Sequence, residues 1–132
     1  MRFLLDTDTC VFAIKRWPAV RTQLERLSPD DLGVSSITLA ELLFGAAKSS
    51  RPEHTRASVA AFLRPFEILP FDQDAAAAYA DTRLQLERAG RPIGERDPLI
   101  ASIARSRRLT VVTHNVREFS RVAGLTVEDW AE

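Results

Sequence analysis

The sequence predicts an α/β fold of three layers, in which a central parallel sheet is flanked by helices. Short apolar runs alternate with longer segments whose apolar residues recur at helical spacing, from one end of the chain to the other. This alternation is typical of a parallel sheet covered on both faces. The length suits one domain, residues 1–132, and 45% of the residues are hydrophobic, which is enough for a packed core.

The first third of the chain predicts two strands and three helices. Residues 2–5 form an apolar run typical of a strand, and residues 7–15 and 19–27 carry apolar residues at helical spacing, with a proline between them. Residues 32–35 predict the second strand. Residues 36–48 follow as a helix, because their apolar residues form one stripe.

The middle of the chain predicts two helices around a strand. Residues 54–64 and 73–89 have helical periodicity, and the short run 67–70 between them predicts the third strand. Gly90 is expected to end the second of these helices in a left-handed conformation, and residues 91–94 form a loop.

The last third repeats the same alternation. Residues 98–106 predict a helix, and the β-branched run 109–113 predicts the fourth strand. Residues 116–122 predict a short helix, and residues 125–127 the last strand. Ligands of such sheets bind beyond the carboxyl ends of the strands, so candidate site residues are sought at that edge.

Composition excludes secreted and membrane-spanning classes. Only three apolar residues lie between Arg2 and Asp6, too few for a secretory signal. The longest uncharged stretch, residues 32–40, falls short of the about 20 residues that a membrane span needs. Cys10 is the single cysteine, so no internal disulfide forms and a reducing compartment, the cytoplasm, is expected, with no membrane partner.

The balance of charge leaves a local nucleic-acid surface open. The formal net charge is zero, which argues against a uniformly basic protein but not against a basic patch. Lys15 and Lys48 are the only lysines; the other sixteen basic residues are arginines, whose forked side chains suit phosphate. A GC-rich genome explains the arginine content equally well, so the content alone decides nothing.

Four acids are expected at one edge of the sheet. Asp6 follows the first strand, Glu41 lies in the helix after the second, Asp97 opens a helix, and Glu118 follows the strand at 109–113. Carboxylates that converge in this way repel one another unless a cation lies among them, and oxygen ligands favour Mg²⁺ or Mn²⁺. Such an ion activates water and stabilises charge on a phosphate, which is the chemistry of a metal-dependent nuclease.

Each acid also has a purely structural interpretation, and the spacing leaves both open. Asp6 can cap the first helix, and Thr38 with Glu41 fits a capping box. Asp97 before a proline is a strong helix start, and Glu118 lies beside two arginines as a surface acid would.

Longer motifs resemble those of the PIN-domain proteins, in particular the VapC toxins. Leu-Leu-Asp-Thr-Asp-Thr at residues 4–9 resembles their opening, and residues 35–45 their second motif. The stretch from Gly90 to Ala101 resembles the third, and residues 113–130 their ending. The four matches occur in the order of the family and span the chain from residue 3 to residue 130.

The resemblance implies a PIN fold and a Mg²⁺-dependent endoribonuclease, with Mn²⁺ as a substitute, that acts as a toxin and is neutralised by a VapB-type antitoxin. By motif matching, Asp6, Glu41 and Asp97 take the catalytic and metal-binding positions, and Glu118 takes the fourth, where an aspartate is common. Asp8 stands where an asparagine is usual, and either adds charge to the site or caps the helix. Homodimerisation and a structured RNA substrate, such as the anticodon region of initiator tRNA, are also implied.

Several other side chains are candidates for supporting roles. Thr113 and Asn115 either orient an acid or water, or only shape the turn after the fourth strand. The arginines expected to hold RNA phosphates are Arg91, Arg96 and Arg117. His54 and His114 are expected to have surface or structural roles, and Cys10 is expected to lie in the core. A groove for an antitoxin helix is sought among the large apolar residues Trp17, Phe44, Phe62, Phe66 and Trp130.

Two other functions fit parts of the sequence. A phosphoacceptor receiver domain also binds Mg²⁺ among acids, but it needs a lysine late in the chain, and the last lysine here is Lys48. A catalytically silent RNA-binding or dimerisation module would be indicated by a missing acid, and none is missing.

Overall fold

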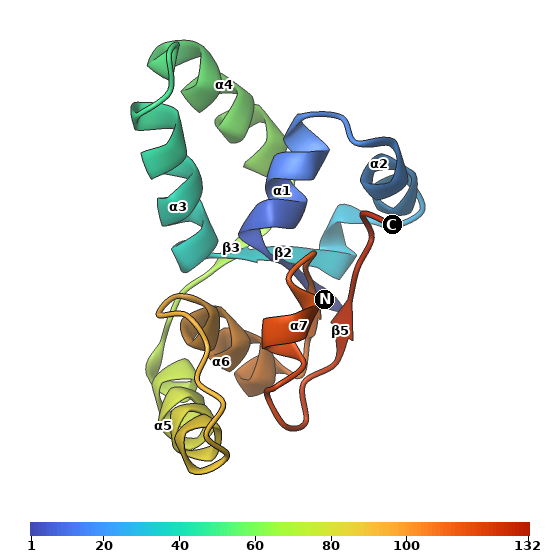
Figure 1. Cartoon of the computed structure of the whole chain (residues 1–132). Coiled ribbons are helices and arrows are strands. Elements are labelled where there is room, and N and C mark those ends of the chain that lie inside the picture. Colours follow the sequence, from blue (N-terminus) through green and yellow to red (C-terminus); the bar gives the residue numbers. More distant parts are fainter.

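Five short strands form a parallel sheet in the order β3-β2-β1-β4-β5 (Figure 1). The computed structural model describes residues 1–132. The strands are β1 Phe3–Leu5, β2 Leu32–Ser35, β3 Glu67–Leu69, β4 Thr110–Val112 and β5 Val127–Glu128. The α/β prediction is therefore confirmed, although the last strand begins at Val127, two residues later than expected.

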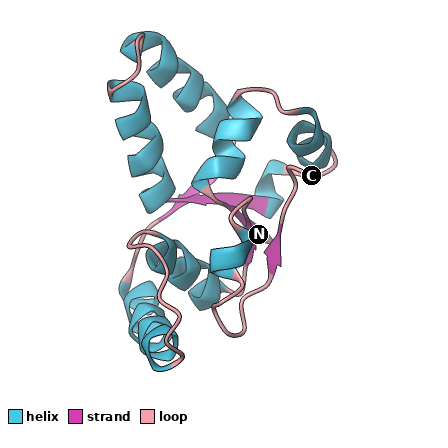
Figure 2. Ribbon diagram, in the orientation of Figure 1, coloured by secondary structure: helices cyan, strands magenta, loops and turns pink.

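Helices cover both faces of this sheet (Figure 2). They are α1 Thr7–Ile14, α2 Pro18–Glu25, α3 Ser36–Ala47, α4 Pro52–Leu63, α5 Gln73–Arg88, α6 Asp97–Arg107 and α7 Val116–Phe119, and a 3₁₀ turn, η1 Pro29–Asp31, precedes β2. All predicted helices are found within two residues of their expected ends except α7, which stops at Phe119. Gly90 has φ +66°, so the predicted left-handed end of α5 is confirmed. No helix combines the length and hydropathy needed to cross a bilayer.

Alternate residues of β1 enter two separate hydrophobic cores, because successive side chains of a strand point to opposite faces. Phe3 and Leu5 belong to the core beneath α1, α3 and α4, together with the fully buried Cys10. Leu4 belongs to the other core, where it meets α5 and α6 through residues such as Ile100. All three residues of β1 are buried, which explains why this strand is a continuous apolar run and not an alternating one.

The order of the strands shows that the sheet grows outward from β1 in both directions. The chain adds β2 and β3 on one side of β1, and later adds β4 and β5 on the other. Leu5 pairs with Val34 on one side and with Val112 on the other, so the carboxyl ends of three strands meet at the same edge. A crevice at such a point is where doubly wound sheets bind ligands.

The large aromatic residues divide into buried and exposed sets. Trp130 is buried and packs edge-on against Phe3 of β1. Phe62 and Phe66 are partly buried against the first core. Trp17 and Phe44 are exposed. Of the five expected groove residues, only these two are therefore available to a partner.

Candidate active site

Asp6 lies directly after β1 and is only 5% exposed. Its N–H donates to Val112 O at 2.9 Å, and its Oδ2 accepts from Thr113 Oγ1 at 2.8 Å. Asp6 is the N-cap residue of α1, as one interpretation expected, but its carboxylate makes no capping hydrogen bond with that helix. Burial raises the pKa of Asp6 to about 7, and the charges of Asp8 and Glu41 add to the rise.

Asp97 and Glu118 share one amide donor. Asn115 Nδ2 lies 3.0 Å from Asp97 Oδ2 and 3.1 Å from Glu118 Oε2. Asp97 is the first residue of α6 and not the cap residue that precedes it. Burial raises the pKa of Asp97 to about 7, and so does its hydrogen bond with Glu118, which in turn lowers the pKa of Glu118. The closeness of the two carboxyl groups therefore favours the protonated form of Asp97 and the charged form of Glu118.

Glu41 reaches the same edge from α3. Its Oε1 accepts from Thr7 Oγ1 at 2.8 Å, and its Oε2 lies 3.3 Å from Arg96 Nη1. The cap of α3 is supplied instead by Ser35, whose Oγ accepts from Thr38 N at 3.0 Å. The capping-box interpretation of Glu41 is therefore wrong.

Thr113 and Asn115 connect the acids to one another. Asn115 N donates to Thr113 Oγ1 at 2.9 Å, which forms the turn after β4. The same threonine hydroxyl donates to Asp6, and the same asparagine amide donates to Asp97. Both interpretations of Thr113 and Asn115 therefore apply. These residues shape the turn after β4, and they also donate hydrogen bonds to the carboxylates of Asp6 and Asp97.

Two residues that follow Asp6 also belong to the site. The hydroxyl of Thr7 donates to Glu41, a contact that the sequence did not predict. Asp8 adds negative charge beside Asp6, which was one of the two interpretations given for it. Its carboxylate also accepts from His114 N at 3.1 and 3.3 Å and so holds the turn after β4, which the sequence did not predict.

The arginines differ in their relation to the acids. Arg96 pairs with Glu41, as expected of a cation at the site, whereas Arg91 and Arg117 are exposed on the surface. Arg121 was not expected here, but its Nη1 donates to a carbonyl of the 91–94 loop at 3.0 Å, and its charge lowers the pKa of Glu118.

The remaining candidates have structural contacts. His114 Nδ1 lies 3.0 Å from Asp129 Oδ2, which ties the turn after β4 to the C-terminal segment. His54 is exposed near the start of α4. Cys10 is fully buried, and burial raises the pKa of its thiol, as expected of a core residue.

The four predicted acids lie at the same edge of the sheet, but they do not surround a common point. No three His, Cys, Asp or Glu side chains lie close enough together to hold a metal ion as they stand. All the donors are nevertheless oxygens, which Mg²⁺ and Mn²⁺ prefer. Repulsion from Asp6 helps to raise the pKa of Asp97, and a cation would relieve that repulsion. By its chemistry the set fits a hard divalent cation.

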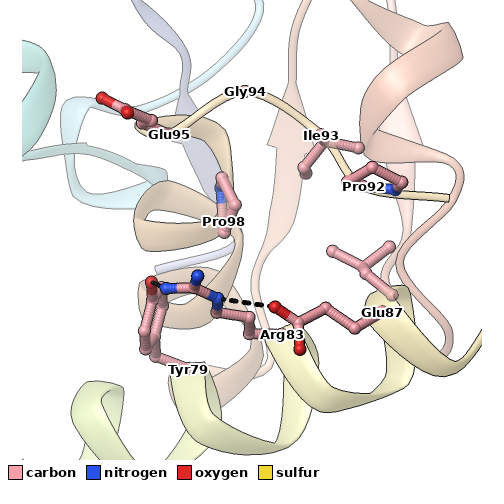
Figure 3. Close-up of a pocket in the computed structure, with 9 residues that line it drawn as sticks. Tyr79, Arg83, Glu87, Pro92, Ile93, Gly94, Glu95 and Pro98 are labelled. Atoms are coloured by element: carbon pink, nitrogen blue, oxygen red, sulfur yellow. Dashed lines mark hydrogen bonds and ion pairs between the residues drawn. The ribbon is translucent and has the colours of Figure 1, made fainter. Parts of the chain in front are cut away.

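A hollow of about 360 Å³ lies between α5 and the loop that leads to α6 (Figure 3). In this view Tyr79, Arg83 and Glu87 form one wall, and Arg83 is held between the other two by hydrogen bonds of 2.9 and 3.2 Å. Gly94, in the opposite wall, adjoins the acids: a methyl group there would lie 3.9 Å from Glu118 Oε2.

Two further hollows meet at Glu41. One, of about 470 Å³, lies over α3 and contains Phe44, Lys48 and Arg96. The other, of about 350 Å³, is an apolar groove between α1, α3 and α4, lined by side chains such as Val11. The acidic edge is thus bordered by one polar and one apolar depression.

Comparison with known proteins finds likeness over the whole chain. Residues 3–125 match the family model described as PIN domain. The chain is 44% identical over 131 residues to the tRNA(fMet)-specific endonuclease VapC of Shigella flexneri, covering 99% of each protein. It is 39% identical over 132 residues to Ribonuclease VapC2 of Rickettsia felis, covering 98% of each.

Solved structures agree with the sequence relatives. The DNA-bound VapBC of Salmonella typhimurium has a chain that superposes with a TM-score of 0.94 at 43% identity, covering 98% of both chains. VapBC2 of Rickettsia felis, bound to a fragment of promoter DNA, gives a TM-score of 0.92 at 38% identity, covering 98% of this chain and 99% of that one.

Proposed function

The chain belongs to the PIN-domain family, and within it to the VapC ribonucleases, and from this premise we propose that its acidic edge hydrolyses RNA with the help of a divalent cation, Mg²⁺ or Mn²⁺. The observation that carries the proposal is the continuous set of hydrogen bonds that joins Asp6, through Thr113 and Asn115, to Asp97 and Glu118. These hydrogen bonds hold one buried and two partly exposed carboxylates close together at the edge of the sheet, which favours a catalytic site over a silent fold.

In this proposal Asp6 and Asp97 would hold the cation most directly, Glu41 would help to hold it or position the water, and Glu118 would support a second ion or the water network. When bound, the cation supplies an activated water and stabilises the charge that develops on the phosphate.

The chain's own donors keep these acids in place. The Thr113 hydroxyl fixes the rotamer of Asp6, and the Asn115 amide holds Asp97 and Glu118 at a common distance. The side chain of Arg96 is 67% exposed beside the acids, where its guanidinium offers a phosphate two parallel donors.

Single substitutions test the proposed site. Asp6→Asn and Asp97→Asn should each lower Mg²⁺-dependent RNA cleavage by more than about 100-fold, beyond the loss typical of a residue that only supports a ligand. Asp30→Asn is the matched control, since Asp30 is an exposed acid in η1, before β2. Near-wild-type cleavage by either site variant would defeat the assignment, and RNA binding without cleavage by the unmodified protein would favour a silent binding module.

We also propose that the substrate is a structured RNA, with initiator tRNA as the first candidate. The support is that curated relatives from Shigella flexneri and Salmonella typhimurium, each 44% identical, are named tRNA(fMet)-specific endonucleases. Sequencing of RNA 5′ ends after induced expression in cells should find new ends in the initiator tRNA anticodon region. New ends confined to other RNAs would overturn the substrate and leave the nuclease proposal standing.

The apolar groove suits an amphipathic helix of a VapB-type antitoxin. Its walls include Val11 and Ile14 of α1, Leu42 of α3 and Val59 of α4, and helices bind such grooves through their apolar face. Ile14→Glu should abolish copurification of the antitoxin while RNA cleavage persists, and Ile14→Val should change neither. Undiminished copurification with Ile14→Glu would contradict this site. A homodimer and a cytoplasmic location stay predictions, which light scattering and cell fractionation would test.

A further inference from the structure

Phe44 is a large aromatic residue whose side chain is exposed to solvent. It is 63% exposed, more than Trp17, Leu43 or Leu84, the other large apolar residues exposed along the helices and their connections. A single exposed apolar residue is ordinary, but this one lines a hollow that opens onto the acidic edge. Its position, and not its exposure alone, therefore requires an explanation.

The hollow combines an aromatic ring with two cations. Phe44 and Lys48 are one helical turn apart on α3, and Lys48 Nζ lies 5.1 Å from the centre of the ring. Arg96 approaches from the loop before α6, and Glu41 belongs to the same lining. A flat apolar surface flanked by cations is what single-stranded nucleic acid needs, because its bases stack and its phosphates seek positive charge.

We propose that Phe44 stacks against an unpaired base of the substrate RNA, next to the phosphate that is cleaved, while Lys48 and Arg96 hold the neighbouring phosphates. This inference rests on the proposed nuclease function and adds to it the binding site of one nucleotide. The cation–π contact of Lys48 is weak at an exposed site, so the ammonium can turn toward a phosphate.

The other two hollows are less suited to a nucleotide. In the hollow of Figure 3, Glu87 and Glu95 supply two carboxylates, and Arg83 is the single cation of the lining. The groove between α1, α3 and α4 has no aromatic ring in its lining and a single cation, Lys15. Only the hollow beside Phe44 joins an exposed ring to two cations and an acid of the site.

The test is steady-state cleavage of an RNA hairpin whose loop is single stranded, with Mg²⁺ present. Phe44→Ala should raise KM about tenfold with a much smaller change in kcat, because a stacked base is lost in binding. Phe44→Trp should keep the wild-type KM, and Phe44→Leu should not, since leucine is apolar but has no flat ring. The matched controls are Leu43→Ala, the exposed neighbour on α3, and Tyr79→Ala, which removes the ring of the other hollow. Melting temperatures confirm that the variants are folded.

A binding measurement separates this inference from the nuclease proposal. The same hairpin, carrying 2-aminopurine at each loop position in turn, should show quenching at one position with Asp97→Asn protein, and the quenching should disappear when Phe44→Ala is added. Lys48→Gln should reduce the slope of log affinity against log salt by about 0.7, the contribution of one phosphate contact in a single strand.

Three results would overturn the inference. The first is a KM of Phe44→Ala within twofold of wild type; the second is Phe44→Leu performing as well as Phe44→Trp. The third is an effect of Phe44→Ala confined to antitoxin binding or self-association, which would make this face a protein interface. If the unmodified protein cleaves no RNA but the Phe44-dependent quenching is seen, the nuclease proposal fails and the stacking site stands; if no hairpin binds, both fail.

Discussion

Replacing Asp6 with asparagine is expected to stabilise the metal-free fold at alkaline pH. The pKa of Asp6 is about 7 in the folded protein against an ordinary value of 3.8, because burial and the charge of Asp8 disfavour the carboxylate. Between these values the folded state binds more protons than the unfolded state, so stability is lost as the pH rises from about 4 through 7. A pKa shift of one unit corresponds to about 1.4 kcal/mol, so the wild-type protein loses about 4 kcal/mol of folding stability over this range. The asparagine variant has no carboxyl group at this position and does not undergo this loss.

Urea unfolding at pH 4.5 and pH 8, both with a chelator, measures this effect. The free energy of unfolding of Asp6→Asn minus that of wild type should increase by about 3 kcal/mol between the two pH values, since part of the loss has occurred by pH 4.5. The Thr113 hydroxyl still has an oxygen to donate to in the variant, and Asp30→Asn controls for the loss of one charge at an exposed position. If the free energies of unfolding of the variant and the wild type differ by the same amount at both pH values, the reasoning is refuted, because a buried carboxylate with a raised pKa requires that difference to change with pH.

Three further outcomes are expected. Thr113→Val removes a buried hydroxyl that donates to Asp6, so unfolding should become easier by about 1.5–3 kcal/mol at pH 8, and the pKa of Asp6, measured by NMR titration, should rise further; Thr113→Ser should restore both, and an unchanged pKa would count against the contact. Asn115→Ala frees Asp97 from its amide donor and should lower kcat for RNA about 10- to 100-fold with little change in KM; a purely KM effect would instead assign Asn115 to substrate binding. Cys10 should resist a thiol reagent until urea unfolds the chain, because its thiol is buried and has a raised pKa; rapid labelling of the native protein would show that α1 opens locally.

The sheet was predictable because its strands are buried on both faces. Leu4 and Leu5 have no exposed neighbour within β1, so the strand stands out as an apolar run. The start of the last strand was predicted two residues too early. This strand pairs on one side only, and its residues, the half-buried Val127 and the exposed Glu128, leave little apolar signal to mark its ends. Helix ends marked by proline or glycine, such as Gly90, were found closely.

The acids of the site were predictable from their places at strand ends, and their surroundings were not. The partner of Asp6 is Thr113, 107 residues away, and the partner of Glu41 is Thr7, 34 residues away. No spacing in the sequence announces such contacts, because they depend on how β1, β4 and α3 pack in space. For the same reason Phe44, in an apolar stretch of α3, is exposed, whereas Trp130, which follows two acidic residues, lies in the core.

The turn that carries Thr113 and Asn115 has a consequence for how the protein is made. It belongs to the final fifth of the chain, so a ribosome that has already synthesised Asp6, Glu41 and Asp97 has not yet supplied the hydroxyl and amide that hold them. These acids therefore stay without both donors until translation is nearly complete. By then α1, α3 and α4 have long been synthesised, so the groove proposed for an antitoxin helix precedes, along the chain, the turn that completes the proposed site.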